Sequence, residues 1–231
     1  PTLIAALPAF FKPGVAIANH AESGRALCSF RGERRLEKIL STIQPGDYLF
    51  IQFGHNDQKD KRDGSGPFTS YKKDLKSYLA AAREKKAHPV LVTPMERRRW
   101  KDGKPQRTLT DFAEAVREVG KEQEVPVIDL HAKSLEFYQA LGEGGSKKAL
   151  VHYPPNTFPN QNSPLKDGTH HSNYGAHQLA RCIVQGIRQQ VPDLARNLRS
   201  PDTTFTPGKP DPAQKITIPT TPGLGEKPEG N

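Results

Sequence analysis

The chain has 231 residues, of which 34% are hydrophobic and 26% are charged, which fits one sizeable domain or two small ones and excludes a fibrous protein. Its apolar runs fall short of the ~18 residues that a transmembrane helix needs, and its first residues have neither a cationic leader nor a cleavage site, so we expect no signal peptide in this sequence. The 34 Lys and Arg residues against 25 Asp and Glu residues give a net charge of +9, which favours a polyanionic partner without choosing among nucleic acid, anionic lipid and acidic polysaccharide.

Apolar runs of strand length alternate with segments of helical period, a pattern that predicts an α/β fold built on a parallel sheet. Strands are predicted at residues 14–18, 48–53, 89–93 and 127–130. Apolar residues three and four apart predict helices within residues 36–43, 75–82 and 109–119. A further helix carries apolar residues at helical spacing over residues 179–187. It is predicted to start at Ser172 or Asn173 and to end before Pro192.

The end of the chain differs in composition. Seven of the chain's 21 prolines, together with four glycines, fall in residues 200–231. We therefore predict an extended or disordered tail there and one domain over residues 1–199. Cys28 and Cys182 are too few for a disulfide framework, and Cys182 lies on the apolar stripe of the last helix, where we expect it to be buried.

The loops that follow the predicted strands are where chemistry is expected, because open parallel sheets bind ligands at the carboxyl ends of their strands. Asp167 and His170 are three residues apart in a loop that is predicted to run into a helix, a spacing that can aim a carboxylate at an imidazole nitrogen and so make a general base. The same pair could be a turn aspartate beside an unrelated histidine.

Two further candidates follow strands. The side-chain amide of Asn56, within Gly54-His-Asn-Asp57, could donate to a developing oxyanion. Gly24, after the first predicted strand, offers an unencumbered backbone N–H. Both are also residues that turns use, so neither decides the function alone.

Taken together and in this order, these loops resemble those of the SGNH (GDSL-type) hydrolases over roughly residues 9–198. The stretches most similar to bacterial rhamnogalacturonan acetylesterases are Ala21-Glu-Ser-Gly-Arg25, Tyr48-Leu-Phe-Ile-Gln-Phe-Gly-His-Asn-Asp57 and Asp167-Gly-Thr-His-His-Ser-Asn-Tyr-Gly-Ala176. The resemblance implies a three-layer α/β/α sandwich with a flavodoxin-like parallel sheet. It also implies that His170 is the catalytic base, that Asp167 orients it, and that the Gly24 N–H and the Asn56 side chain form the oxyanion hole.

The sequence departs from this family in one major respect. The nucleophilic serine of the family lies in a Gly-Asp-Ser block at the end of the first strand, and these 231 residues contain no Gly-Asp-Ser. Residues 1–12 resemble the helix that follows this block, so we expect the usual first strand and its serine to be missing from this sequence. Ser23 and Ser29 lie near the second block but not at a strand-to-helix turn, so neither is assigned as the nucleophile.

The resemblance implies an esterase that removes acetyl groups from a plant cell-wall polysaccharide, here rhamnogalacturonan, through a serine acyl-enzyme and without a cofactor or metal. It further implies a monomer, secreted or periplasmic in full length, with an acetylated polysaccharide or oligosaccharide as partner and no nucleic-acid or membrane partner. The alternative is a catalytically dead or truncated remnant that keeps the fold and only binds carbohydrate.

A basic stretch remains outside these motifs. It contains Arg97, Arg98, Arg99, Lys101, Lys104 and Arg107, with only Asp102 against them. Such a run is often a solvated face, but it also suits a substrate that contains uronic acids. Trp100 within it could stack on a sugar ring or pack locally. His55, His170, His171 and His177 show no metal-ligand spacing, and His171 and His177 are expected at the surface or behind the site.

Overall fold

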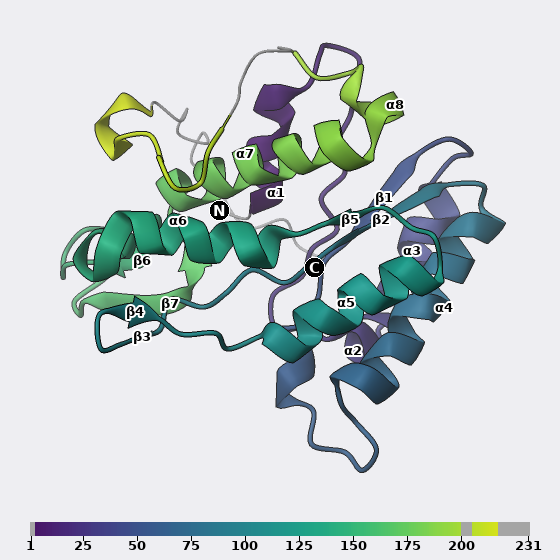
Figure 1. The fold of residues 1–231 in the computed structure, drawn as a ribbon, viewed down its shortest axis with the longest axis horizontal. Coiled ribbons are helices and arrows are strands. Elements are labelled where there is room, and N and C mark those ends of the chain that lie inside the picture. The colour runs from purple at the N-terminus through teal and green to yellow at the C-terminus, as the bar shows by residue number, and fades with distance from the viewer. Residues whose placement is uncertain (1–2, 200–204, 217–231) are drawn as a thin grey trace.

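The computed structural model describes residues 3–199 and 205–216 and has a three-stranded parallel sheet at its centre (Figure 1). The strands are β1 (Tyr48–Ile51), β2 (His88–Val92) and β5 (Val127–Ile128), in the order β1-β2-β5. Tyr48 pairs with His88 and Leu91 with Val127. The predicted α/β class is confirmed, and three of the four predicted strands form, each shorter at its carboxyl end.

Side chains of β2 alternate between two hydrophobic clusters. Val90 and Val92 belong to the cluster on one face of the sheet, and Leu91 belongs to the cluster on the other. Each of these three side chains is at most 3% exposed. Burial on both faces explains why the strands are continuous apolar runs in the sequence.

Helices cover both faces, so the predicted three-layer arrangement is confirmed (Figure 1). One face packs against α1 (Leu3–Ala6), α6 (Leu130–Gly145), α7 (Asn173–Gln190) and α8 (Pro192–Ala195). The other packs against α2 (Leu27–Gly32), α3 (Arg35–Thr42), α4 (Lys72–Glu84) and α5 (Thr110–Glu122). The three predicted crossover helices are α3, α4 and α5.

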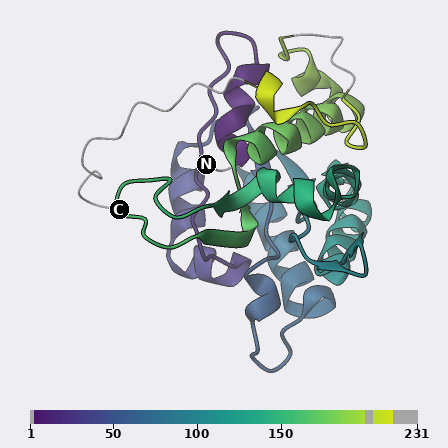
Figure 2. The same cartoon turned by 90° about the vertical axis from the view of Figure 1, so that its left-hand side faces the viewer.

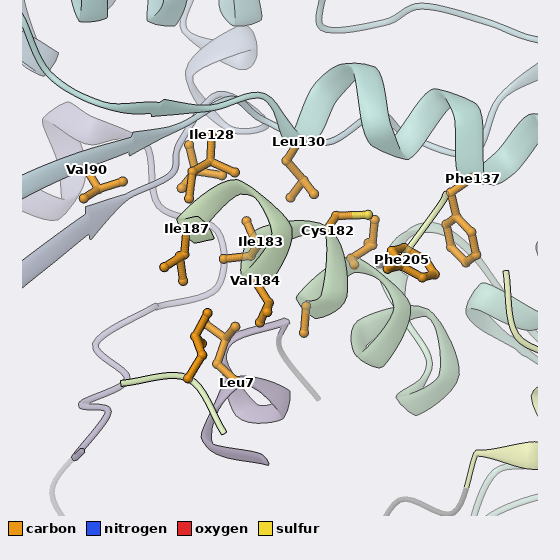
Figure 3. Packing of buried hydrophobic residues seen from close by; sticks show 14 of the residues in the cluster. Leu7, Val90, Ile128, Leu130, Phe137, Cys182, Ile183, Val184, Ile187 and Phe205 are labelled. Carbon is orange, nitrogen blue, oxygen red and sulfur yellow. The ribbon is translucent and has the colours of Figure 1, made fainter. Parts of the chain in front are cut away.

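The long helix α7 lies directly on the sheet. Figure 3 shows its residues Ile183 and Ile187 beside Val90 and Ile128 of the strands. Gly186 makes this approach possible, because a Cβ atom at that position would lie 2.4 Å from Ile128 Cγ2. Ser172 is the N-cap of α7 and accepts a hydrogen bond from Gly175 N–H at 3.2 Å, which decides between the two predicted caps.

Two antiparallel ribbons, which the sequence did not predict, lie at one end of the molecule (Figures 1 and 2). One joins β3 (Trp100–Lys101) to β4 (Lys104–Pro105), and the other joins β6 (Leu150–Tyr153) to β7 (Leu165–His171). The prediction that residues 167–171 form a loop is therefore wrong, because they belong to β7. The ribbon is irregular there, since four residues, 167–170, lie opposite Val151 alone.

The predicted strand at residues 14–18 does not form, which corrects the sequence-based expectation. Within the described part of the chain, β1 pairs with β2 only, so these residues have no strand beside them. Val15 and Ile17 nevertheless pack against the core. The alternating apolar pattern thus predicted which side chains face inward, but a strand also needs a backbone partner.

Residues 127–130 are predicted as one strand, but the strand ends at Ile128. Asp129 accepts a hydrogen bond from Ala132 N–H at 3.2 Å and caps α6, a helix that the sequence did not predict. The 3-10 helix Leu7–Phe10 follows α1, in agreement with the helical prediction for the start of the chain.

The predicted tail, residues 200–231, is described only over residues 205–216. There the backbone is irregular apart from the 3-10 helix Ala213–Lys215, but Phe205 is 3% exposed and belongs to the core cluster (Figure 3). Asp211 pairs with Arg181 of α7. This part packs on the domain and does not extend away from it; the rest of the predicted tail lies outside the described residues. Cys182 is buried as predicted, and both cysteines are free.

Candidate active site

Asp167 and His170 contact each other on the irregular part of β7. Asp167 Oδ2 lies 2.5 Å from His170 Nδ1, and Asp167 Oδ1 accepts the backbone N–H groups of Thr169 at 2.7 Å and His170 at 3.0 Å. Burial raises the pKa of the Asp167 carboxyl, but the hydrogen bonds from His170 and Thr169 outweigh it, so the pKa lies below its usual value. An ionised carboxylate holds Nδ1 as the protonated nitrogen of the ring.

The other ring nitrogen of His170 is available for chemistry. The His170 side chain is 67% exposed, and Nε2 makes no hydrogen bond within residues 3–199 and 205–216. A neutral imidazole with Nδ1–H on a carboxylate presents Nε2 as a proton acceptor. The pair therefore has the geometry of a general base and its orienting acid.

Asn56 and Gly24 are brought together from separate loops. Asn56 Nδ2 donates to the backbone oxygen of Arg25 at 3.4 Å, and Asn56 Oδ1 accepts from Lys59 Nζ at 2.9 Å. Gly24, directly before Arg25, has φ of +78°, and its N–H has no partner among the described residues. Two donors on adjoining segments can converge on one oxygen atom, as an oxyanion hole requires.

Asp57 holds this arrangement, a role that sequence reasoning did not assign to it. Its carboxylate accepts Leu27 N–H and Gly54 N–H, each at 2.9 Å, and so ties the loop after β1 to the start of α2. Burial raises the pKa of Asp57. Gly54 has φ of +135°, and a Cβ atom there would lie 2.9 Å from Pro94 Cγ, so only glycine fits. In the sequence, Asp57 stands among residues that are common in turns, so its presence could be explained by a turn alone.

Two arginines of the basic stretch link the loops. Arg97 Nη2 donates to His55 O at 2.8 Å, beside Asn56. Arg98 N–H donates to Gly168 O at 2.7 Å, beside Asp167. A Cβ atom on Gly168 would lie 2.9 Å from Arg98 O, so the two segments are in close contact. These arginines join the segment of Asn56 to the segment of Asp167 and His170, and the expectation of a wholly solvated run is wrong for them.

His171 lies behind the site. Its side chain is enclosed, with the residue 6% exposed, stacked on Tyr138, whose hydroxyl lies 2.7 Å from His171 Nε2. Burial lowers the pKa of His171 to about 3. This histidine stays neutral at ordinary pH.

Ser23 and Ser29 do not contact the base. Ser29 Oγ donates to Ala26 O at 3.2 Å within α2, and no serine hydroxyl within the described ranges bonds to His170. Over these same ranges, the structure contains no group of three or more His, Cys, Asp or Glu side chains that could hold a metal ion. No described helix combines the length and apolar character needed to cross a membrane.

Comparisons with known proteins show the family of the chain. The profile of the GDSL-like lipase/acylhydrolase family matches residues 2–161. The chain is 42% identical over 180 residues to rhamnogalacturonan acetylesterase RhgT of Bacillus subtilis, covering 78% of this chain and 77% of the relative. It is 36% identical to the probable rhamnogalacturonan acetylesterase YesY of the same organism, over 76% and 77% of the two chains.

Solved structures show the same fold. The protein YxiM of Bacillus subtilis superposes with a TM-score of 0.68 at 23% identity, over 81% of this chain and 49% of that chain. Axe2, an acetylxylan esterase of Geobacillus stearothermophilus, superposes with a TM-score of 0.53 at 20% identity, over 80% and 78% of the two chains.

Proposed function

Because the chain belongs to the GDSL-like lipase/acylhydrolase family of carboxylic ester hydrolases, we propose that it removes acetyl groups from a plant cell-wall polysaccharide, rhamnogalacturonan. Two relatives above 35% identity that carry this activity in their names support the substrate class. The observation that carries the proposal is the Asp167–His170 contact, in a segment joined through Arg98 and Arg97 to the loop of Asn56.

In the proposed mechanism, His170 Nε2 takes the proton of a serine hydroxyl as the oxygen attacks the acetyl carbonyl carbon. Asp167 stabilises the imidazolium that forms. The Gly24 N–H and Asn56 Nδ2 donate to the carbonyl oxygen as it gains negative charge. The proton then passes to the departing sugar oxygen, and water hydrolyses the acetyl-enzyme with His170 again as the base.

The test measures acetate released from acetylated rhamnogalacturonan by a version of the protein that carries the Gly-Asp-Ser serine. His170→Ala should abolish release while circular dichroism shows an unchanged fold. The matched variant His171→Ala removes a neighbouring imidazole and should cost much less activity per folded molecule. Substantial turnover by His170→Ala would remove the assignment of the base, and a larger loss in His171→Ala would mean that the wrong histidine was chosen.

A second candidate function, carbohydrate binding without hydrolysis, is favoured by one observation. Within the described ranges no serine hydroxyl contacts His170. On this candidate, the 231-residue chain shows no hydrolysis of p-nitrophenyl acetate above a heat-killed control. Genuine turnover that vanishes in Ser23→Ala or Ser29→Ala would contradict it and identify the nucleophile.

A further inference from the structure

An open groove lies between the β3–β4 ribbon and the 3-10 helix Asp57–Lys59 that follows Asn56. Among the residues that the structure describes, six cationic side chains and no carboxylate line it; we call it the basic groove and define it by Lys59, Lys61, Arg97, Arg99, Lys101 and Arg107. Its remaining lining residues are neutral and include Trp100. The groove is therefore a concave surface of one sign of charge.

Four of these cations have no partner among the described residues. The side chains of Lys61, Arg99, Lys101 and Arg107 are exposed and make no ion pair or hydrogen bond within residues 3–199 and 205–216. Some cations on the helical layer are instead paired. Lys72, for example, contacts Glu118 at 2.7 Å and Glu122 at 2.6 Å. Clustered like charges repel unless an anion lies between them, so the basic groove has the charge of an anion site.

The basic groove is continuous with the candidate active site. Lys59 Nζ bonds to Asn56 Oδ1 at 2.9 Å, and Arg97 Nη2 bonds to His55 O at 2.8 Å. Arg98, between the cations of the groove, bonds through its N–H to Gly168 O beside Asp167. A chain molecule whose ester lies between Asn56 and His170 would therefore run past these cations.

A buried carboxylate anchors the segment that carries the arginines of the groove. Glu96 is 1% exposed and accepts hydrogen bonds from Thr108 N–H at 2.7 Å, Thr108 Oγ1 at 2.6 Å and Leu109 N–H at 2.9 Å. It also lies 2.7 Å from His131 Nε2. The hydrogen bonds to Thr108 and Leu109 join the two ends of the segment that contains the β3–β4 ribbon. The backbone that carries the cations is therefore held in place.

The aromatic content of the groove favours an acidic saccharide over a nucleic acid. Single-stranded nucleic acids are bound by several aromatic rings on which successive bases stack. The groove has one, Trp100, which also packs partly against the core. One ring with nearby Gln106 and Thr108 suits a sugar chain, which offers apolar ring faces and hydroxyl groups.

We propose that the basic groove binds the carboxylates of uronic-acid residues that flank the acetylated sugar, so that the site selects an acidic polysaccharide over a neutral one. The inference rests on the proposed function for the position of the ester. Arg99, Lys101 and Arg107 are assigned as the residues that recognise the substrate's charge, and none of them contacts the reacting atoms.

The test measures binding of an unacetylated hexamer of galacturonic acid to the 231-residue chain by calorimetry, with a xylose hexamer as the neutral probe. The triple variant Arg99→Ala, Lys101→Ala, Arg107→Ala should weaken binding of the acidic hexamer on the order of tenfold or more. The control triple Lys38→Ala, Lys73→Ala, Lys121→Ala removes three exposed cations of α3, α4 and α5. It changes net charge equally and should leave affinity within about twofold, because these lysines do not line the groove and salt screens exposed charges.

Several results would overturn the inference: equal loss in the two triple variants, equal affinity for the two hexamers, or no binding at all. Tighter binding of a uridine hexanucleotide than of the acidic hexamer would assign the groove to nucleic acid instead. Thermal melts of both triples verify that they fold. Selective, groove-dependent binding together with a serine-carrying version that releases no acetate would sink the proposed function and leave the groove assignment standing.

Discussion

Asn56 depends for its position on the residue that follows it. The Asp57 carboxylate bonds to backbone N–H groups of two separate segments, at Leu27 and Gly54, so the turn that contains Asn56 cannot move away from the Gly24 loop without losing buried hydrogen bonds. The Asn56 amide itself makes only one long contact there, 3.4 Å to Arg25 O. A donor that is weakly engaged in the resting protein can turn toward an oxyanion.

We therefore predict that Asn56→Ala lowers kcat on the order of 10²-fold in a version of the protein that carries the serine, with little change in KM. The reason is that the lost hydrogen bond strengthens only as the carbonyl oxygen becomes negative. Steady-state kinetics on an acetyl ester measures both constants. A rise in KM with kcat unchanged would make Asn56 a residue that binds the ground state.

At the scale of elements, α7 illustrates how a helix is fitted to the sheet. Ten of its residues are buried, and its approach to β5 is limited by Gly186 and Ile128. Helix propensity would favour alanine over glycine in the middle of α7 by ~1 kcal/mol. The glycine at this position is therefore explained by the close packing of α7 on β5 and not by helix propensity.

Gly186→Ala is accordingly predicted to destabilise the protein by ~1–3 kcal/mol, because a methyl group 2.4 Å from Ile128 Cγ2 forces the helix or the strand to shift. The control is Gly144→Ala in α6, where an added Cβ meets nothing within 4 Å. Urea denaturation of both variants gives the two free energies of unfolding. An unchanged or raised stability for Gly186→Ala would show that this contact is not close in solution.

At the scale of the whole molecule, the site is built where two different sheets meet. The parallel sheet supplies Asn56 through β1, and the separate β6–β7 ribbon supplies the Asp167–His170 pair. The buried His171, at the end of β7, contacts Tyr138 of α6. Anything that charges its ring therefore acts on the packing between the ribbon and α6.

Acid sensitivity follows from this burial. The pKa of His171 is about 3 in the folded protein, against about 6.5 for an unperturbed imidazole, so between these pH values the unfolded state binds more protons than the folded state. The contribution of His171 to the free energy of unfolding is therefore fully present above about pH 6.5 and is lost as the pH drops toward 3. The total loss is several kcal/mol, because each pH unit in this range contributes ~1.4 kcal/mol. His55, whose pKa burial lowers to about 4, adds to the same trend.

Thermal melts should show that Tm falls as the pH is lowered from about 7.5 to about 4.5. His171→Phe removes the titrating ring and should reduce the slope of Tm against pH, whatever its Tm at pH 7.5. His88→Phe, at an exposed histidine, is the control and should keep the slope of the parent protein. An equal slope in all three would mean that His171 is not what destabilises the protein in acid.

Local patterns in the sequence determined the class of fold and most elements of the parallel sheet and of the helices that cover it. Continuous apolar runs predicted β1 and β2, and apolar residues at helical spacing predicted α3, α4, α5 and α7, because burial depends on the period of the chain itself. The order of the motifs, by resemblance, pointed to Asp167, His170, Asn56 and Gly24 as one site, and their roles remain predictions. For Asp167 and His170, the spacing alone allowed the contact that the structure contains.

Tertiary structure decided what depends on a distant partner. Residues 14–18 have the alternation of a strand, and Val15 and Ile17 face the core, yet no strand pairs with them in the described part of the chain. The β6–β7 ribbon and the linking role of Arg97 and Arg98 were likewise not predictable, since each rests on hydrogen bonds to residues twelve or more positions away. A period in the sequence specifies which way side chains point, whereas the backbone and guanidinium partners that complete the site are chosen only when the chain has folded.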